Sequence, residues 1–353
     1  MSLPRVLHVD SGRSWRGGQR QVLLLATGLH DRGYRTLVVG PAGSPLVQRA
    51  ERAGLPTYRL TLRGEWDVRR ARELRAVARE WHADIIHAHD ARSHTIALIA
   101  QLFRRKSRLV VTRRVVFPPK RVSLKYKWGV DAFIAISNAV RDVMVDAGMR
   151  PDRIKVVYSG VPIPQVNQPR DWRAERGWAA DTVVCGIVGA MTREKGLDSV
   201  GAIARRLPPE VLARTRIILL GGKGKGETAA AGVETFDAGF VTDIHDAVAG
   251  LDLLWHPARS EGLGTGVIDA MALGVTPIAF AVGGLPEVIE DGVSGRLVPA
   301  GAVDAFAAAA AELISDDALR ARLSAGARKR ARQFDSASMI EQTAEVYNSV
   351  TPG

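Results

Sequence analysis

The sequence predicts an α/β protein with two doubly wound domains, and three observations lead to this fold class. The chain has 353 residues, which is more than one domain usually holds. Short β-branched runs alternate with helical patterns in both halves, and this alternation is typical of parallel sheets covered by helices on both faces. Pro162, Pro164 and Pro169 interrupt the alternation near the middle, so we place a linker there.

The first half opens on a strand pattern at residues 5–9, followed by a helical pattern at residues 19–31. Further strands are predicted at residues 36–40, 84–89, 108–112 and 132–137, with helices between them. Since these elements suit one parallel sheet, we assign residues 1–160 to an N-terminal domain.

After the linker at residues 161–170, the same alternation begins again. Strands are predicted at residues 182–188, 216–220, 251–256 and 276–280, with helices at residues 196–207 and 265–273. Residues 171–335 therefore form a second doubly wound domain. Ligands of open α/β sheets bind beyond the carboxyl ends of the strands, so we expect the two domains to face each other across a cleft lined by strand-to-helix loops.

Composition excludes several classes of protein. Hydrophobic residues make up 46% and charged residues 24% of the chain, which excludes a disordered or fibrous protein. The one cysteine, Cys185, cannot form an intramolecular disulfide, and no stretch reaches the roughly 18 apolar residues that a membrane span needs. Because the chain also enters its first strand without an apolar signal region, we predict a cytoplasmic protein.

Positive charge is concentrated in the first half of the chain. Residues 1–165 contain 30 Lys and Arg against 13 Asp and Glu, a net charge of +17, whereas residues 166–353 contain 19 against 24, a net charge of −5. Such a difference indicates that the first domain faces an anionic partner. Nucleic acid, an anionic bilayer and a phosphorylated glycan all have the required charge.

One segment of the first half, from Ala91 to Val130, contains no acidic residue. Anionic headgroups attract basic side chains by about 1 kcal/mol each, and interfacial aromatic residues add to the attraction. We therefore predict that residues 92–128 bind an anionic membrane surface, which places the protein on the inner face of the cytoplasmic membrane. The side chains concerned are Arg104, Arg105, Lys106, Arg108, Arg113, Arg114, Lys120, Arg121, Lys125 and Lys127, with Phe117, Tyr126 and Trp128 among them.

Several glycine-rich loops follow the predicted strands. Gly17 and Gly18 lie between the first strand and an apolar helix, where backbone N–H groups suit a phosphate or a sugar hydroxyl, although a tight turn is an equal alternative. Residues 222–226 also follow a strand, but their glycine spacing does not match a dinucleotide loop, so we interpret them as a flexible loop.

The segment from Ser260 to Ala272 carries the strongest chemical signal in the sequence. Glu261 precedes a glycine-rich turn, Gly264-Thr265-Gly266, whose N–H groups can hold a diphosphate at the start of a helix. Asp269 lies about one and a half turns into that helix, so two acids bracket one anion site. An acid placed near a helix N-terminus for structural reasons alone is the alternative.

Two further loops carry candidate side chains. Gly189 ends the first strand of the second domain, and Arg193 and Lys195 follow it at the carboxyl edge, where they can neutralise phosphates. His89 is placed to reach the cleft, whereas we expect His87 to be a hydrogen-bonded core residue. We expect these two histidines to point to opposite faces of the strand, so we predict no shared metal ion and no metal site in the chain.

These segments, taken in order, resemble the retaining glycosyltransferases of family 4, which have the GT-B fold of two Rossmann-like domains. The resemblance covers nearly the whole chain and is strongest in the Glu-x7-acid segment from Glu261 to Asp269. Supporting matches are Gly17-Gly18, His89, Lys195-Gly196 and the segment 283–287.

The resemblance implies a role for each matching residue. Glu261 contacts the donor sugar, the amides of Gly264 to Gly266 hold the diphosphate, and Asp269 binds the ribose hydroxyls. Lys195 balances the charge of the leaving nucleoside diphosphate, which explains catalysis without a metal ion, and we expect no cofactor. His89 hydrogen-bonds the donor sugar, while the site we predict also includes Gly17, Gly18, Gly189, Thr265 and Arg193.

The sequence departs from the family pattern at three places. Ala190 stands where the family usually has an arginine, and Arg193 is the residue that could replace it. The second acid is Asp269 instead of glutamate, and residues 159–162 replace the common Asn-Gly-Val-Asp. The last residues, 336–353, resemble the family's C-terminal helix, which crosses back to the first domain.

The hypothesis from sequence is a retaining glycosyltransferase that moves a sugar from a UDP- or GDP-type donor to a hydroxyl of an envelope glycan or glycolipid, such as lipopolysaccharide core. A nucleotide-sugar epimerase of the same fold is one alternative, and a basic nucleic-acid-binding protein is a remote one, since the Glu261 to Asp269 segment has no use in it. The donor base, the sugar, the acceptor and the oligomeric state do not follow from the sequence.

Overall fold

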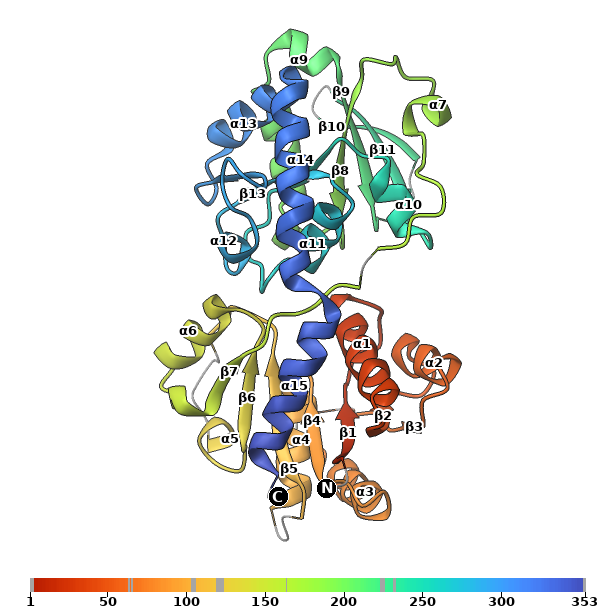
Figure 1. The fold of residues 1–353 in the computed structure, drawn as a ribbon, viewed down its shortest axis with the longest axis vertical. Helices are drawn as coiled ribbons and strands as arrows, with labels where there is room; N and C mark the ends of the chain where they lie inside the picture. The colour runs from red at the N-terminus through yellow and green to blue at the C-terminus, as the bar shows by residue number, and fades with distance from the viewer. Residues whose placement is uncertain are drawn as a thin grey trace. The chain divides into compact units, whose positions relative to one another are not determined.

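The computed structural model describes residues 3–62, 64, 66–102, 106–118, 124–162, 164–222, 226–230 and 233–351. The chain divides into two compact units, each with its own sheet (Figure 1). The N-terminal unit comprises Met1–Gly160 and Ser336–Gly353, and the C-terminal unit comprises Val161–Asp335. The predicted fold class, two α/β units with largely parallel sheets, is confirmed.

The sheet of the N-terminal unit has, in the part of the chain that is described, seven parallel strands in the order β3-β2-β1-β4-β5-β6-β7. Its central strands are almost wholly apolar because helices cover both faces of a parallel sheet. The strands are β1 (Arg5–Val9), β2 (Arg35–Gly40), β3 (Thr57–Arg59), β4 (Ile85–Ala88), β5 (Arg108–Arg113), β6 (Ala132–Ala135) and β7 (Ile154–Val156).

The helices of this unit connect the strands in βαβ fashion, and several begin at side-chain caps. Asp90 caps α4 with a capping box, and Ser137 caps α6 through the backbone N–H of Val140. The helices are α1 (Gly17–Asp31), α2 (Pro45–Arg52), α3 (Val68–Glu80), α4 (Ala91–Gln101), α5 (Leu124–Lys127), α6 (Asn138–Asp146) and the 3₁₀ helix η1 (Pro151–Arg153).

The last helix, α15 (Ser336–Val350), belongs to the N-terminal unit although it ends the chain. Its apolar side chains Met339, Ile340 and Tyr347 share one buried cluster with residues of β1, β4 and α1. Gly28 of α1 allows this contact, since a Cβ there would lie 2.2 Å from the Ile340 side chain. The core of the first unit is therefore completed by the C-terminus of the chain.

The sheet of the C-terminal unit has the strand order β10-β11-β9-β8-β12-β13-β14, seven strands within the described ranges. All neighbours are parallel except β10 and β11. The strands are β8 (Val183–Val188), β9 (Thr215–Leu220), β10 (Gly226–Ala230), β11 (Val233–Gly239), β12 (Leu253–His256), β13 (Thr276–Phe280) and β14 (Arg296–Val298).

Helices cover this second sheet as well, and its core includes Trp255, Phe280 and Phe306. Trp172, in the first helix of the unit, is buried and donates its indole N–H to the carbonyl of Ala247. The helices are α7 (Trp172–Arg176), η2 (Arg193–Lys195), α8 (Leu197–Ala204), α9 (Pro209–Ala213), α10 (Ile244–Ala249), α11 (Thr265–Ala272), α12 (Leu285–Val288), α13 (Val303–Ser315), α14 (Asp317–Ala331) and η3 (Arg332–Phe334).

Two sequence expectations are corrected by the fold. The residues interpreted as a flexible loop at 222–226 include Gly226, which is the first residue of β10, while residues 223–225 lie outside the described residues. The strand expected at residues 84–89 ends at Ala88, so His89 belongs to the loop that follows. Among the described residues, no helix is both long and apolar enough to cross a membrane.

Each sheet has a point where the direction of strand succession reverses. In the first sheet the reversal lies between β1 and β4, and in the second it lies between β8 and β12. In open α/β sheets, loops at the carboxyl ends of such strands form the ligand crevice. The two candidate clusters described next both lie at these points.

Candidate functional site

In the C-terminal unit, an ion pair joins the loops that follow β8 and β12. The Lys195 ammonium lies 2.5 Å from Oε2 of Glu261. Both side chains are partly buried, with 31% of Lys195 and 15% of Glu261 exposed. The structure therefore brings together two of the predicted catalytic residues, although they are 66 positions apart in the sequence.

Close backbone packing fixes the loops that carry this pair. A Cβ at Gly196 would lie 1.7 Å from the carbonyl oxygen of Pro257, and a Cβ at Gly283 would lie 1.8 Å from the carbonyl oxygen of Glu261. Both glycines also have positive φ angles. The Lys195-Gly196 and Gly283-Gly284 pairs noted in the sequence thus have a steric reason: they let three loops contact one another.

A third side chain, His256, joins the ion pair and was missed by the sequence analysis. It is the last residue of β12, is 6% exposed, and its Nε2 lies 3.1 Å from the same Glu261 oxygen that contacts Lys195. The available signal was one polar residue ending the apolar run Leu253–Trp255, five positions before Glu261. In a chain with eight histidines, that signal alone did not distinguish His256.

The electrostatics of this cluster favour an ionised carboxylate. Burial alone would raise the pKa of Glu261. The hydrogen bond from His256 and the charge of Lys195 outweigh burial and lower that pKa to about 2. Glu261 is therefore a permanent anion at neutral pH and can accept hydrogen bonds from hydroxyl groups.

Beside this cluster, the N-terminus of α11 presents backbone N–H groups. Gly264 adopts a left-handed conformation at the N-cap, and the helix continues with Thr265 and Gly266, with neither a side-chain cap nor an acidic residue in its first turn. Asp269 lies further along the same helix, 13% exposed, with Oδ1 4.0 Å from Nε2 of His245. The predicted donor-binding residues of this segment thus share one helix start.

The loop after β8 contains the remaining candidates of this unit. Gly189 follows the strand with a φ of 122°, a conformation that favours glycine. Arg193, the predicted replacement for the missing arginine at Ala190, is 80% exposed and its Nε lies 3.5 Å from Oδ2 of Asp198. In this structure Arg193 is therefore paired with Asp198, and Lys195 is the cation that contacts Glu261.

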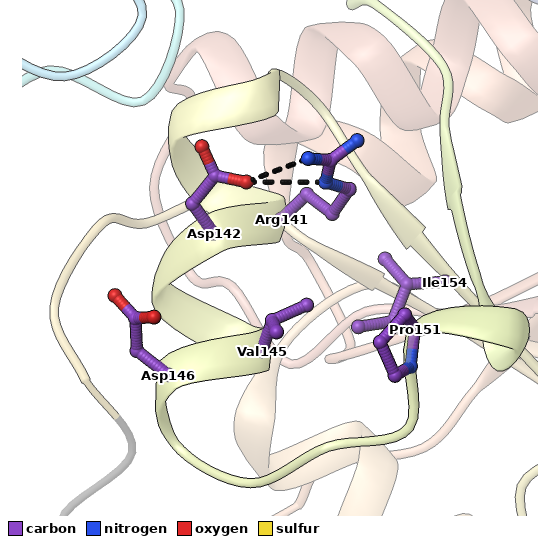
Figure 2. Close-up of a pocket in the computed structure, with 6 residues that line it drawn as sticks. All are labelled: Arg141, Asp142, Val145, Asp146, Pro151 and Ile154. Carbon is purple, nitrogen blue, oxygen red and sulfur yellow. Dashed lines mark hydrogen bonds and ion pairs between the residues drawn. The ribbon is translucent and has the colours of Figure 1, made fainter.

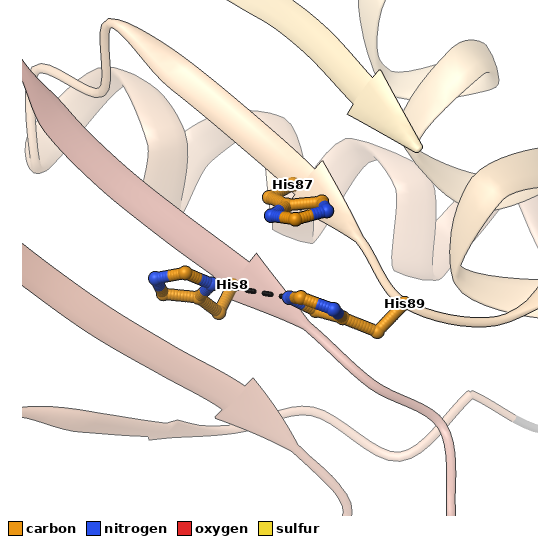
Figure 3. Close-up of side chains that lie close together, drawn as sticks. All are labelled: His8, His87 and His89. Atoms are coloured by element: carbon orange, nitrogen blue, oxygen red, sulfur yellow. Dashed lines mark hydrogen bonds between the residues drawn. The ribbon is translucent and has the colours of Figure 1, made fainter. Parts of the chain in front are cut away.

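In the N-terminal unit, three histidines cluster at the switch point of the sheet. Figure 3 shows His8 of β1 beside His89, with His87 of β4 above them. The rings of His87 and His89 have centroids 4.0 Å apart. The expectation that these two residues point to opposite faces is wrong, because residues two positions apart in a strand lie on the same face, and the two rings accordingly lie against each other.

Their burial makes these histidines neutral. His8, His87 and His89 are 0%, 0% and 3% exposed. Burial lowers the pKa of His8 to about 3 and holds the pKa values of His87 and His89 well below the usual range. His87 is the core residue that the sequence predicted, since its ring nitrogens contact the hydroxyls of Tyr347 and Thr112, each at 2.6 Å.

The same three histidines form a group with metal-ligand spacing, the one such group found among the described residues, since their ring nitrogens approach within 4.8 Å of one another. The chemistry of the donor set does not suit a metal ion. Both nitrogens of His87 already contact hydroxyl groups, and the ring of His87 overlies that of His89, whereas a metal lies in the plane of each imidazole that binds it. His8 Nδ1 and His89 Nε2 instead bond to each other at 3.1 Å.

Gly17 and Gly18 lie in the chain's first crossover, after β1. They are the first residues of α1, and Arg16 at the N-cap provides no side-chain hydrogen bond to the helix. A Cβ at Gly18 would be 3.7 Å from the Arg114 side chain, so a cation from the loop after β5 lies against the helix start. The side chain of Asp10, also missed in the sequence, is buried nearby and accepts from Gln19.

The predicted anionic-surface segment, residues 92–128, is described in part. Arg104, Arg105, Lys120 and Arg121 lie outside the described residues. Among the described residues of this segment, four large apolar side chains are exposed: Leu102 at 68%, Val115 at 45%, Phe117 at 52% and Trp128 at 72%.

A surface hollow of about 400 Å³ lies elsewhere in the N-terminal unit, between α6 and the turn into β7. Figure 2 shows Val145, Pro151 and Ile154 on its apolar side and the Arg141–Asp142 pair at its rim. No residue predicted for the site lines it. The hollow is therefore separate from the candidate site.

Comparison with known proteins agrees with this architecture. Residues 15–164 match the model of Glycosyltransferase Family 4, and residues 169–330 match that of Glycosyl transferases group 1. The structure of Anabaena HepE in complex with UDP superposes with a TM-score of 0.84 at 22% identity, covering 98% of this chain and 100% of that one. WaaG, a glycosyltransferase involved in lipopolysaccharide biosynthesis, gives a TM-score of 0.70 at 17% identity, covering 99% and 100%.

Among curated proteins, a D-inositol 3-phosphate glycosyltransferase of Stackebrandtia nassauensis is 32% identical over 227 residues. That match covers 58% of this chain and 51% of the relative, so the chain spans about half the length of that protein. The two α/β units and the likeness to HepE show the GT-B fold. Because the two family models together cover most of the sequence, the chain belongs to the family 4 glycosyltransferases.

Proposed function

We propose that this protein is a retaining glycosyltransferase that moves a sugar from a UDP- or GDP-type nucleotide sugar to a hydroxyl group of an envelope glycan or glycolipid. The observation that carries the proposal is the cluster of Lys195, His256 and Glu261 beside the start of α11. A cation, a fixed carboxylate and free backbone N–H groups occur together there. A nucleotide sugar needs these three kinds of partner, for its phosphates and its sugar hydroxyls.

The proposed reaction is a single displacement in which each of these groups has a role. The bond between the anomeric carbon and the diphosphate breaks, and a bond from the acceptor oxygen to that carbon forms on the same face. The acceptor's hydroxyl proton leaves with the departing phosphate oxygen. Lys195 and the N–H groups at Gly264 to Gly266 stabilise the negative charge that develops on the leaving group, while Glu261 orients the sugar.

We propose further that the enzyme needs no metal ion for this step, because Lys195 and the helix start supply the positive potential that a divalent cation supplies elsewhere. A chelator should then leave transfer unchanged. Activity that disappears with a chelator and returns with Mg²⁺ or Mn²⁺ would contradict this part of the proposal.

The acceptor side rests on the charge and exposed side chains of the N-terminal unit. An acid-free segment with Phe117 and Trp128 exposed suits peripheral binding to an anionic membrane, where lipid-linked acceptors such as lipopolysaccharide core lie. The likeness to WaaG is consistent with such an acceptor. Sedimentation with anionic vesicles, absent with neutral vesicles and lost in high salt, is the expected result.

The donor is tested first by thermal stabilisation with UDP, GDP, ADP and their glucose conjugates. The HepE structures contain UDP and UDP-glucose, so this pair is the first choice. A ligand at about 100 times its dissociation constant adds roughly 2.7 kcal/mol, a shift of several degrees. Stabilisation by one nucleotide base, with or without chelator, is expected, and no shift with any nucleotide would overturn the donor site.

Catalysis is tested with Glu261→Ala, assayed with the donor found above and lipopolysaccharide core or glycolipid acceptors. We expect transfer to fall by at least about 100-fold while the fold is retained, since a group that orients the reacting sugar is lost. Full activity of the variant contradicts the site. An epimerase would instead convert the donor without an acceptor, and a nucleic-acid-binding protein would show steeply salt-dependent binding to DNA or RNA.

A further inference from the structure

The carboxylate of Glu261 is held asymmetrically by its neighbours. Its Oε2 atom contacts both Lys195 Nζ, at 2.5 Å, and His256 Nε2, at 3.1 Å. Its Oε1 atom accepts only a 3.2 Å hydrogen bond from the backbone N–H of Gly262 among the side-chain contacts described. One oxygen is thus anchored twice, and the other faces a weaker partner.

The two anchors differ in how firmly the structure holds them. His256 ends a fully buried strand, and 7% of its side chain is exposed. Lys195 lies in a loop, has a flexible four-carbon side chain, and is 31% exposed. The histidine is therefore a fixed partner, whereas the lysine has the length and the freedom to turn toward another anion.

This difference matters because the proposed reaction asks Lys195 to do two things. It contacts Glu261 in the structure, and in the proposed reaction it stabilises the diphosphate of the donor. A lysine that turns toward the diphosphate weakens its bond to Glu261. Without a second anchor the carboxylate would lose its position at the moment when it must orient the sugar.

We infer that His256 is a positioning residue, which holds the Glu261 carboxylate in place for the donor sugar while Lys195 is shared with the diphosphate. The inference rests on the proposed function and adds a residue that acts through Glu261 without touching the substrate. A neutral imidazole with a proton on Nε2 is sufficient, because an N–H donor to Oε2 is all that the geometry requires.

The test compares His256→Leu with His256→Gln in the full chain. Leucine removes the donor and keeps the bulk, whereas the glutamine side-chain nitrogen can take the place of Nε2. We expect His256→Leu to weaken binding of the nucleotide sugar by about tenfold, the typical effect of losing a hydrogen bond to a charged group. His256→Gln should recover most of that loss.

The discriminating readout is calorimetric titration with UDP and with UDP-glucose, or with the pair selected by the donor screen. Because Glu261 faces the sugar, affinity for the free nucleotide should change by less than about twofold, while affinity for the sugar conjugate falls. Equal losses for both ligands, or no loss for either, would overturn the inference. A general structural defect would lower both affinities together with the melting temperature.

A ligand-free measurement keeps the inference testable if no nucleotide sugar binds. His256→Leu, Glu261→Gln and the double variant form a double-mutant cycle of unfolding stability in the absence of ligand. Clear non-additivity is expected from residues in direct contact, and additive effects would show that the contact holds nothing. If the wild-type protein shows no transfer but the two substitutions are non-additive in unfolding stability, only the proposed function is overturned. If the wild-type protein transfers sugar but the two substitutions are additive, only the role of His256 is overturned.

Discussion

The two switch-point clusters use histidine in opposite ways, and the contrast shows how burial decides the chemistry of one side chain. In the N-terminal unit, His8, His87 and His89 pack against one another, and burial keeps all three neutral. In the C-terminal unit, His256 lies beside the Glu261 carboxylate and the Lys195 ammonium. One cluster excludes charge, and the other is built around it.

The partners of each cluster explain this difference. The neutral histidines bond to hydroxyls and to each other, which requires no ion and fits the centre of a sheet. The charged cluster lies at the loop ends, where partial exposure lowers the cost of holding two ions. The first cluster is therefore suited to packing and neutral hydrogen bonds. The second is suited to binding and stabilising an anionic ligand.

The largest expected effect is a difference in acid stability between the units. His8, His87, His89 and His94 all have pKa values lowered by burial, so the unfolded state binds protons more readily. Their contribution to the free energy of unfolding is complete above the pKa of histidine in the unfolded chain, about 6.5. Below that pH it is lost at about 1.4 kcal/mol per histidine for each pH unit. Lowering the pH from 7 to 5.5 should destabilise the N-terminal unit by about 5 kcal/mol in total.

Glu261, whose pKa is lowered to about 2, also loses its contribution to stability as the pH falls, but in a lower pH range than the histidines. Its contribution is present above about 4.5 and is lost only as the pH falls toward 2. Hydrogen exchange resolved by peptide should therefore show β1 and β4 losing protection at a higher pH than β8 and β12. Simultaneous loss in both units contradicts the contrast, and His94→Phe should reduce the pH dependence of the first unit by about a quarter.

The next largest effect concerns the cation of the charged cluster. Lys195→Met removes the ammonium and leaves a side chain of similar length, so the developing charge on the leaving diphosphate loses its main stabilising group. We expect kcat to fall by about 100-fold or more, the usual cost of losing one stabilising group in a transition state. Steady-state kinetics with the identified donor and acceptor measure this, and kcat within a factor of three of wild type would remove Lys195 from the mechanism.

The sequence predicted the sheets better than it predicted the side-chain clusters. The central strands were found because helices bury both of their faces, which leaves long apolar runs such as those at β1, β8 and β13. Five strands of the described residues were missed. β3, β7 and β14 have three residues each and lie at or near the sheet edges, where no long apolar run is needed. β10 and β11 form the antiparallel end of the second sheet, and β11 alternates buried with partly exposed residues, so it also lacks a continuous apolar run.

For the candidate site, the glycine-rich segment at Glu261 was visible because a sharp turn at a helix start requires particular residues. The resemblance placed Lys195 and Glu261 in one site, but their ion pair was not predicted, since 66 residues separate them. His256 and His8 left no comparable signal, because an isolated histidine in an apolar strand looks the same whether it packs or anchors a carboxylate. His89 was misplaced because the prediction treated residues two apart as if they were adjacent, whereas positions i and i+2 of a strand share one face.

A smaller effect tests the neutral cluster. Tyr347 of α15 is buried, and its hydroxyl lies 2.6 Å from Nδ1 of His87. Tyr347→Phe removes this bond and leaves a buried ring nitrogen without a partner, at a cost of about 1–2 kcal/mol. Urea unfolding monitored in the N-terminal unit measures the loss. His87 and Tyr347 contact each other, so His87→Phe combined with Tyr347→Phe should cost less than the sum of the single variants.

The smallest effect expected is that of Arg193→Met, which sharpens the distinction between the two cations of the loop after β8. Arg193 is 80% exposed and 3.5 Å from Asp198, so water and that carboxylate screen its charge. If it replaces the arginine that the family has at Ala190, its removal should weaken nucleoside diphosphate binding by only about two- to fivefold and leave kcat unchanged. A loss as large as that of Lys195→Met would mean that Arg193 leaves Asp198 and contacts the diphosphate directly when donor binds. Titration of both variants with the same nucleotide, at low and at high salt, distinguishes these outcomes, because only a screened surface charge loses its effect as salt rises.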